Sequence, residues 1–342
     1  MPSKKTTIVL GAGASAEASL PTGAKLKKNI AASLNFAFEN LRQTSGDPTI
    51  RMALNYEPQV DLCFQAAEKI CRALPQASSI DEYLENHRGD KEIERCGKLA
   101  IVKSILEAEK DSLMYIRPES ISREINFSSI ENTWFNRFWQ QLTRGCQEND
   151  LKERFSSIVL IIFNYDRCLE HYLYRSIQNY YGLPADVAAS LVNSIEIFHP
   201  YGTVGSLPWN GGPAQVGFGA EPTWGDLRML ATQIKTFTEG TDPHESDVVT
   251  IRRHVADADR LIFLGFAYHQ QNINLLKGSR EDRSNTSARC YGTAHGISDN
   301  DLPVIEDELN KIYVDKIPRE MTIGKLTCHE LFEQYSRKLS FV

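Results

Sequence analysis

Four short, continuous runs of apolar residues divide the chain and predict the strands of a parallel sheet. They are TTIVL before Gly11, SSIVLIIF before Asn164, IEIF before His199 and RLIFL before Gly265. Apolar runs of this length without polar alternation are typical of strands that are buried on both faces. A last short strand is expected in SARCYGTAHG, residues 287–296.

Apolar residues at helical spacing fill most of the chain between Gly23 and Gln147. The stretches are AKLKKNIAASLNFAFENL, VDLCFQAAEKICRAL, SIDEYLE, IERCGKLAIVKSILEAEKDSL and NTWFNRFWQQLTRGC. Further helices are expected in CLEHYLYRSIQNYY, LPVIEDELNKIY and LTCHELFEQYSRKL. Because strands and helices alternate outside the helical block, the sequence predicts an α/β fold with a parallel sheet covered on both faces.

The first strand belongs to this sheet although the helical block separates it from the second strand, so the block is interpreted as an insertion. We predict a Rossmann-like domain made of residues 1–26 and 152–342, and an inserted all-helical, zinc-free domain at residues 27–151. Zinc is not expected because the seven cysteines are scattered and no CxxC pair occurs. No metal-binding residue is predicted.

Composition and charge limit the compartment of the protein and the partners that it can bind. The formal net charge of -6 disfavours a general nucleic-acid surface, which needs clustered Lys and Arg to displace counterions from phosphates. The apolar run before Gly11 is too short for a secretion signal or a membrane span. The odd number of scattered cysteines suits reduced thiols. We therefore expect a cytoplasmic protein that binds neither membranes nor nucleic acid directly.

The turn after the first strand carries the pattern Gly11-x-Gly13-x-x-Ala16. This is the dinucleotide-binding fingerprint in its variant with alanine at the third position. The small residues would let backbone N–H groups approach a pyrophosphate. The alternative is that the glycines serve only a tight turn with a positive φ.

Polar or small residues also follow the other strands, and in an open α/β sheet ligands bind beyond the carboxyl ends of the strands. Taken singly, an Asn or Asp there caps a helix or forms a turn, and a lone His is more often structural. Their recurrence at successive strand ends favours a shared site. These residues are Asn164 and Asp166 after the second strand, His199 and Gly202 after the third, and Gly265 and Phe266 after the fourth.

These motifs resemble those of the sirtuins, and more closely those of the sirtuin-like NAD-consuming domains of bacterial antiphage defence. GAGASAEASLP is similar to the sirtuin phosphate-binding segment, FNYD to the Gln-Asn-Ile-Asp motif, HPYG to the His-Gly turn, and FLGF to the strand end that contacts adenosine. The resemblance implies that Asn164 and His199 are catalytic. It also implies cofactor-binding roles for Gly11, Ala12, Gly13, Ser15, Asp166, Gly202, Gly265 and Phe266.

The chain also departs from the sirtuins. The Asp-Phe-Arg after the first motif is replaced by PTGAKL, the Gln of the second motif is Phe163, and the four zinc cysteines are absent. Since the zinc module shapes acyl-peptide binding in sirtuins, its loss disfavours deacylation. The helical insert, SIDEYLE and FNYDRCLEHYLY look instead like the defence branch, whose members hydrolyse NAD to nicotinamide and ADP-ribose.

The resemblance therefore implies an NAD glycohydrolase with NAD as its substrate, acting as an antiphage (abortive-infection) effector. Two alternatives stay open: a non-catalytic NAD- or ADP-ribose-binding regulatory module of a defence complex, and a sirtuin-type deacylase or ADP-ribosyltransferase. The resemblance also implies a homo-oligomer and, as a partner, a HerA-type ATPase.

Cleavage of the nicotinamide N-glycosidic bond develops oxocarbenium charge on the ribose, so the site must stabilise that sugar and deliver water. Asn164 can orient water or a ribose hydroxyl, and His199 can accept a proton. Asp166 either accepts from the carboxamide or caps the following helix. His269 and His295 are minor candidates for ligand contact. The aromatic stretch from Trp134 to Trp139 forms either the core of the insert or an exposed surface for a partner.

Overall fold

The computed structural model describes residues 5–40, 42–120, 123–244, 246–278, 288–313 and 318–341, and these residues contain one six-stranded parallel sheet. Its strands are β1 (Thr6–Leu10), β4 (Ile158–Ile162), β5 (Glu196–Phe198), β6 (Arg260–Leu264), β7 (Arg289–Thr293) and β8 (Glu320–Gly324). Their spatial order is β5-β4-β1-β6-β7-β8. Counted along the chain, this is the order 3-2-1-4-5-6 of doubly wound, dinucleotide-binding folds. The predicted α/β class and parallel sheet are confirmed, and the strand order reverses between β1 and β6.

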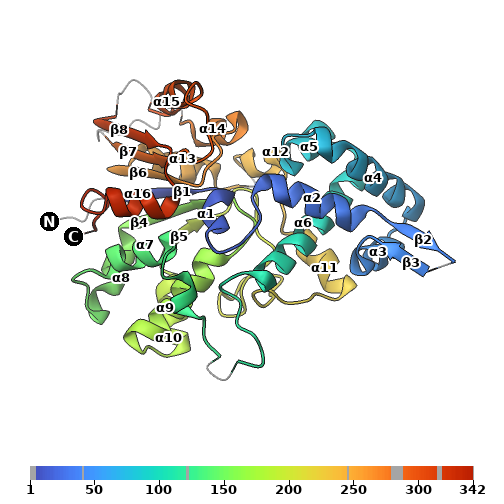
Figure 1. The fold of residues 1–342 in the computed structure, drawn as a ribbon, viewed down its shortest axis with the longest axis horizontal. Helices are drawn as coiled ribbons and strands as arrows, with labels where there is room; N and C mark the ends of the chain where they lie inside the picture. Colours follow the sequence, from blue (N-terminus) through green and yellow to red (C-terminus); the bar gives the residue numbers. More distant parts are fainter. Residues whose placement is uncertain are drawn as a thin grey trace.

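The three central strands β1, β4 and β6 are buried at every position. Successive side chains of a strand point to opposite faces, so Ile8 belongs to one hydrophobic core and Val9 to the other. Helices pack on both faces (Figure 1). The core of Ile8 includes α7 (Trp134–Thr143), α8 (Leu151–Ser156), α9 (Cys168–Tyr181), α10 (Ala185–Val192) and α16 (Cys328–Gln334). The core of Val9 includes α13 (Val248–Ala256), α14 (Gln270–Leu276) and α15 (Leu302–Asn310).

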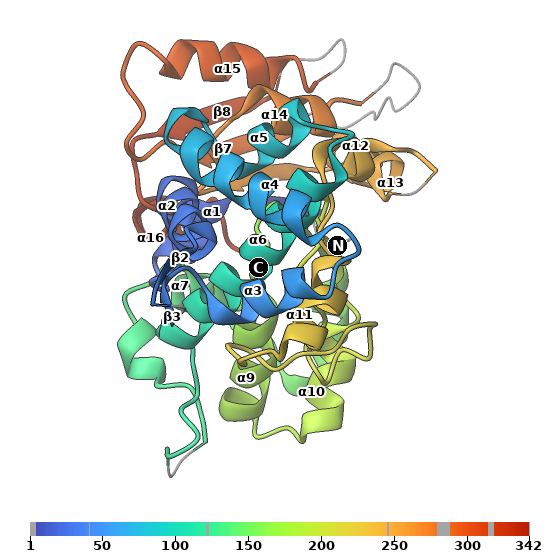
Figure 2. The same cartoon turned by 90° about the vertical axis from the view of Figure 1, so that its right-hand side faces the viewer.

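A group of helices extends the core of Val9 away from the sheet, to the right in Figure 1 and toward the viewer in Figure 2. Asp47, Ser79 and Asp90 each cap one of these helices by accepting a hydrogen bond from the backbone N–H three residues further on. The elements of this region are α2 (Gly23–Leu34), α3 (Pro48–Asn55), α4 (Val60–Ala73), α5 (Ile80–Asn86), α6 (Lys91–Asp111), α11 (Trp224–Ala231) and α12 (Phe237–Thr241). The short helix α1 (Ala12–Ala16) follows β1 instead, and its Ala14 belongs to the core of Ile8.

Two local predictions are wrong. The helix expected in AKLKKNIAASLNFAFENL ends at Leu34, and a short antiparallel hairpin follows, made of β2 (Ala37–Glu39) and β3 (Arg42–Ser45). Asn40, between β2 and β3, has a φ of +48°, a conformation that asparagine adopts more readily than most residues and that suits a hairpin turn. The strand at residues 289–293 is also not the last, because β8 pairs beside it at the edge of the sheet.

The aromatic helix α7 is buried, which agrees with a core role for its rings. Trp134, Phe135 and Phe138 share their core with Ile8, and the Trp134 indole N–H donates to the Ala14 carbonyl at 2.8 Å. These rings therefore pack against the sheet. The predicted domain boundaries stay a prediction. In the part of the chain that the structure describes, no helix is long and apolar enough to span a bilayer.

Candidate functional site

A cavity of about 810 Å³ opens at the carboxyl ends of β1, β4 and β6, where the strand order reverses. Its sheet side includes the turns at Gly11, Asn164 and Gly265. Its opposite side is formed by the helical region, with Asp81 of α5 and Ile105 of α6. The volume lies in the upper part of the range typical of small-molecule sites, at the position where doubly wound folds bind ligands.

Most of the predicted site residues come together in this cavity. Three of them, Ser15, His199 and Gly202, do not line it. A Cβ on Gly202, whose φ is +72°, would lie 1.9 Å from the Gln233 carbonyl oxygen, so this glycine serves close backbone packing. The residues that line the cavity are Gly11, Ala12, Gly13, Asn164, Asp166, Gly265 and Phe266, together with the minor candidates His269 and His295.

The glycines of the first motif pack against the turn at the end of β6. A Cβ on Gly11 would lie 2.5 Å from the Gly265 carbonyl oxygen, and one on Gly13 would lie 2.8 Å from the Gly265 Cα. The Gly13 N–H donates to the Gly265 carbonyl at 2.9 Å, and the Ala14 N–H donates to the Gly11 carbonyl at 2.9 Å. The small residues therefore let two turns meet, and these two amides are already engaged.

The side-chain amide of Asn164 donates both of its N–H groups within the protein. Its Nδ2 donates to the Gly11 carbonyl at 3.1 Å and to the Ser15 Oγ at 2.9 Å. A carbonyl oxygen only accepts, so the contact with Gly11 fixes which end of the amide is the nitrogen. Among the described residues the carbonyl Oδ1 has no donor, and Asn164 lines the cavity. Asn164 therefore offers an acceptor to a ligand there.

Asp166 combines the two roles left open by its sequence context. Its Oδ1 accepts from the Cys168 backbone N–H at 3.1 Å, at the start of α9, and from the Ser15 hydroxyl at 3.0 Å. The residue also lines the cavity. Burial raises the pKa of this carboxyl, although the hydrogen bonds from Cys168 and Ser15 oppose the increase. Asp166 thus caps a helix and faces the cavity at the same time.

His199 lies beneath Asn164 and is paired with a carboxylate. Its Nε2 is 2.7 Å from the Glu170 Oε1, and its Nδ1 is 3.3 Å from the Asn164 backbone oxygen. Burial alone would lower the pKa of His199, but the charge and hydrogen bond of Glu170, with the Asn164 carbonyl, raise it above 6.5. A carbonyl and a carboxylate only accept, so a protonated ring can donate to both from its two nitrogens, and the contact with the carbonyl supports the Asn164 backbone.

Two further acidic contacts near the cavity were not singled out from the sequence. Asp81 lines the cavity and accepts from the Tyr165 hydroxyl, and burial raises the pKa of its carboxyl. From the sequence, SIDEYLE was interpreted as a helix and as part of the family resemblance, with no site role for Asp81, because only the packing of α5 over the strand ends brings Asp81 to Tyr165. Glu17 lines the cavity too, but it accepts from the Trp134 and His329 backbone N–H groups.

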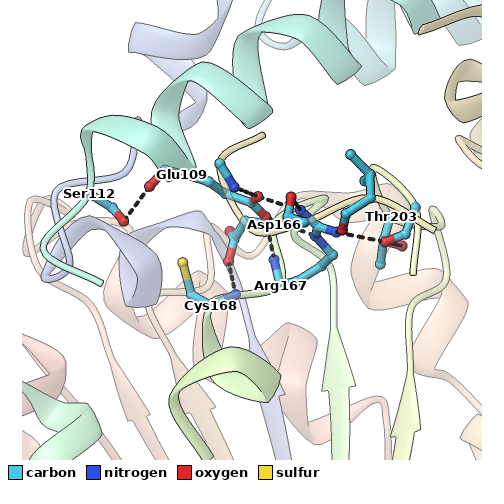
Figure 3. Close-up of polar contacts among 10 residues, drawn as sticks. Glu109, Ser112, Asp166, Arg167, Cys168 and Thr203 are labelled. Carbon is cyan, nitrogen blue, oxygen red and sulfur yellow. Dashed lines mark hydrogen bonds and ion pairs between the residues drawn. The ribbon is translucent and has the colours of Figure 1, made fainter. Parts of the chain in front are cut away.

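A buried ion pair joins the helical region to the strand end beside Asp166 (Figure 3). Glu109, at the end of α6, accepts from the Arg167 Nε at 3.0 Å and from the Gly219 N–H at 2.9 Å. Arg167 also donates to the Val216 carbonyl at 2.7 Å. Both side chains of the pair are almost completely buried. The pair therefore fixes Arg167, and with it the start of α9, against the last turn of α6.

The fold and cavity define an α/β protein of the doubly wound class with a ligand-sized cavity at the strand-order switch. In the described part of the chain, no three His, Cys, Asp or Glu side chains are grouped to hold a metal ion. No protein-family model and no curated protein matches the chain. Among solved structures it is similar to a mutant Sir2 homologue in complex with 2'-O-acetyl ADP ribose. The TM-score is 0.39 and the identity 12%, covering 98% of this chain and 92% of that one.

Proposed function

We propose that the protein binds NAD in the cavity at the strand-order switch and hydrolyses it to nicotinamide and ADP-ribose. One observation carries the proposal: the Asn164 carboxamide is held by two donations, to Gly11 and Ser15, its carbonyl has no donor among the described residues, and the residue lines the cavity. A locked acceptor at this place is suited to a ribose hydroxyl or to an attacking water, because no reorganisation is needed when charge develops.

The pyrophosphate would lie against the glycine-rich turn. The amides of Gly13 and Ala14 are engaged within the protein. Among the described residues no acceptor lies within hydrogen-bond reach of the Ala12 or Phe266 backbone N–H, and both residues line the cavity. We therefore assign these two amides to the pyrophosphate, with the nicotinamide ribose beside Asn164.

In the reaction, the bond between the ribose C1' and the nicotinamide nitrogen breaks, and its electron pair neutralises the positive charge of the ring. Water oxygen forms the new bond to C1' and releases one proton. The positive charge that develops on the ribose is stabilised by nearby carboxylates, for which Asp166 and Asp81 are the candidates on the cavity wall. Their raised pKa values also suit a group that takes up the released proton.

His199 acts in this scheme as a positioning residue. Its ring supports the Asn164 backbone and is paired with Glu170, and it does not line the cavity. As a general base it would first have to leave this pair and reach the cavity. Replacing His199 should therefore lower turnover through a displaced Asn164, with less effect than replacing Asn164 itself.

The test is nicotinamide release from NAD by the wild-type protein and by Asn164→Ala, with NAD affinity measured by calorimetry. Loss of a fixed polar group in the transition state costs about two to three orders of magnitude in turnover, while ground-state affinity stays nearly unchanged. Asn310→Ala, on the exposed end of α15, is the matched control and should behave as wild type.

Three outcomes distinguish the proposed NAD hydrolase from its two alternatives. A turnover that falls only in the Asn164 variant supports hydrolysis. If the wild type and both variants bind NAD but release no nicotinamide, the non-catalytic binding module is favoured. Transfer of ADP-ribose or an acyl group to a protein substrate, in place of hydrolysis, would favour the sirtuin-type alternative.

The cellular role follows from the motif resemblance and is part of the same proposal. An NAD hydrolase of antiphage defence must be inactive in a healthy cell, so we propose control by homo-oligomerisation and by a HerA-type ATPase partner. Light scattering and nicotinamide release of the purified chain, alone and mixed with a HerA-type ATPase, test this. A chain that stays monomeric with full activity would refute both forms of control.

A further inference from the structure

A second cavity, of about 430 Å³, lies outside the candidate NAD site and shares no residue with it. It is formed by the segment that follows α6, by α9 and by the loop before α11. Its lining residues are Ile116, Arg117, Pro118, Arg123, His171, Arg175 and Phe218.

The cavity gathers positive charge without a compensating carboxylate. Three of its lining residues are Arg117, Arg123 and Arg175, and no Asp or Glu lines it. Within the described residues, none of these three arginines forms an ion pair with a carboxylate, and Arg175 is half-buried. The Arg175 Nε is buried without a hydrogen-bond partner. Like charges held together in this way are stabilised by a bound anion.

His171 adds a buried polar group to the same cavity. It is 5% exposed, its ring stacks on Phe218 at 4.2 Å, and its Nε2 has no partner in the described structure. Burial, together with the charges of Arg175 and Arg167, lowers its pKa to about 3. The ring is therefore neutral at physiological pH and adds no positive charge of its own to the arginines.

The wall of this cavity is preformed. Phe218 lies between Gly217, whose carbonyl accepts from Arg167, and Gly219, whose N–H donates to Glu109. The buried Glu109–Arg167 pair thus holds the loop that carries the aromatic ring. A ligand would meet a fixed surface, which reduces the entropy cost of binding.

We propose that this arginine-lined cavity binds a small molecule that carries a phosphate group. Guanidinium groups match phosphate oxygens with paired N–H donors and keep their charge at all physiological pH values. Phe218, Ile116 and Pro118 provide an apolar surface for the remainder of the ligand. Free pyrophosphate and a nucleotide share this chemistry, and the two probes below distinguish them.

The experiment is calorimetric titration of the full chain with inorganic pyrophosphate and, separately, with ADP. We expect one-to-one binding by the wild type, and an affinity lowered about tenfold or more in Arg175→Gln and in Arg123→Gln, since each removes a charge-assisted contact. Arg144→Gln changes an exposed arginine outside the cavity and should leave the affinity unchanged. Tighter binding of ADP than of pyrophosphate would assign the apolar surface to a nucleotide.

Two results would overturn the proposal. The first is absence of binding of both probes to the wild type. The second is binding that neither arginine variant weakens, which would place the anion in the other cavity. Arg123 is exposed, so Arg123→Gln gives the answer even if Arg175→Gln does not fold. Binding of either probe in the candidate NAD site would not respond to the arginine variants, because the two cavities share no residue, so the affinity lost in these variants tests the arginine-lined cavity alone.

Discussion

The buried pair of Glu109 and Arg167 allows a stability prediction with a defined magnitude. Glu109→Gln keeps the size of the side chain but removes the negative charge that compensates Arg167. The Glu109 side chain is 0% exposed and that of Arg167 is 2% exposed, so water cannot take over this role. Removing one partner of such a pair costs about 3–5 kcal/mol, because the remaining charge stays buried.

The free energy of unfolding of Glu109→Gln should therefore fall by about 3–5 kcal/mol, measured by urea denaturation followed by circular dichroism. The matched control is Glu107→Gln on the same helix. Glu107 is 53% exposed and pairs with Lys103, and an exposed pair of this kind contributes about 1 kcal/mol or less. Equal losses in the two variants would refute the reasoning.

A double variant separates the cost of an unpaired charge from the value of the pair itself. Glu109→Leu combined with Arg167→Met removes both charges and keeps apolar volume. Replacing a whole buried pair in this way is often close to neutral. The double variant should therefore be more stable than Glu109→Gln. A double variant that is less stable would show that the hydrogen bonds of Arg167 to the loop at 205–217 dominate.

Two further predictions concern the strand ends. Gly265→Ala should prevent folding, because the φ of Gly265 is +56° and a Cβ there would lie 1.9 Å from the backbone nitrogen of Ala14. Expression and circular dichroism test this, with Gly225→Ala as the control, since a Cβ on Gly225 meets only ordinary contacts. The raised pKa of His199 means that its pair with Glu170 contributes fully below pH 6.5 and that this stability is lost as pH rises through the folded-state pKa. The free energy of unfolding lost in His199→Gln should therefore be larger at pH 6 than at pH 8.5, and the reverse order in urea titrations would contradict the assignment.

The central strands could be predicted from the sequence because burial on both faces leaves an unmistakable pattern. Ile158 to Ile162 are all apolar and all buried, so periodicity and position agree. β8 has no such pattern, since Ile323 is its one buried residue and the strand lies at the edge of the sheet. The hairpin after Leu34 was not predicted for a similar reason. β2 is fully exposed, so its residues have no buried pattern that would distinguish this strand from a continuation of the helix.

The candidate site was predictable only where its residues follow strands. Asn164 and Asp166 were found because the carboxyl ends of parallel strands converge. Asp81 depends on how a helix packs over those ends, and no local signal marks that packing. Arg117 and Arg123 follow α6, whereas Arg175 lies on α9, so only the fold brings the three arginines to one cavity.

The glycines after β1 show how a binding motif and a packing requirement can share one sequence. Gly11 and Gly13 are small because the turn of Gly265 approaches them, and this approach holds together the two strand ends between which the cavity opens. Enlarging Gly13 would therefore disturb the fold before it reached any pyrophosphate, and loss of NAD binding in such a variant would not identify a ligand contact. Asn164 is different, because its carbonyl is free while its amide nitrogen is held. Replacing Asn164 therefore tests the chemistry of the cavity directly, provided that circular dichroism shows the turn of Gly11, to which its nitrogen donates, still in place.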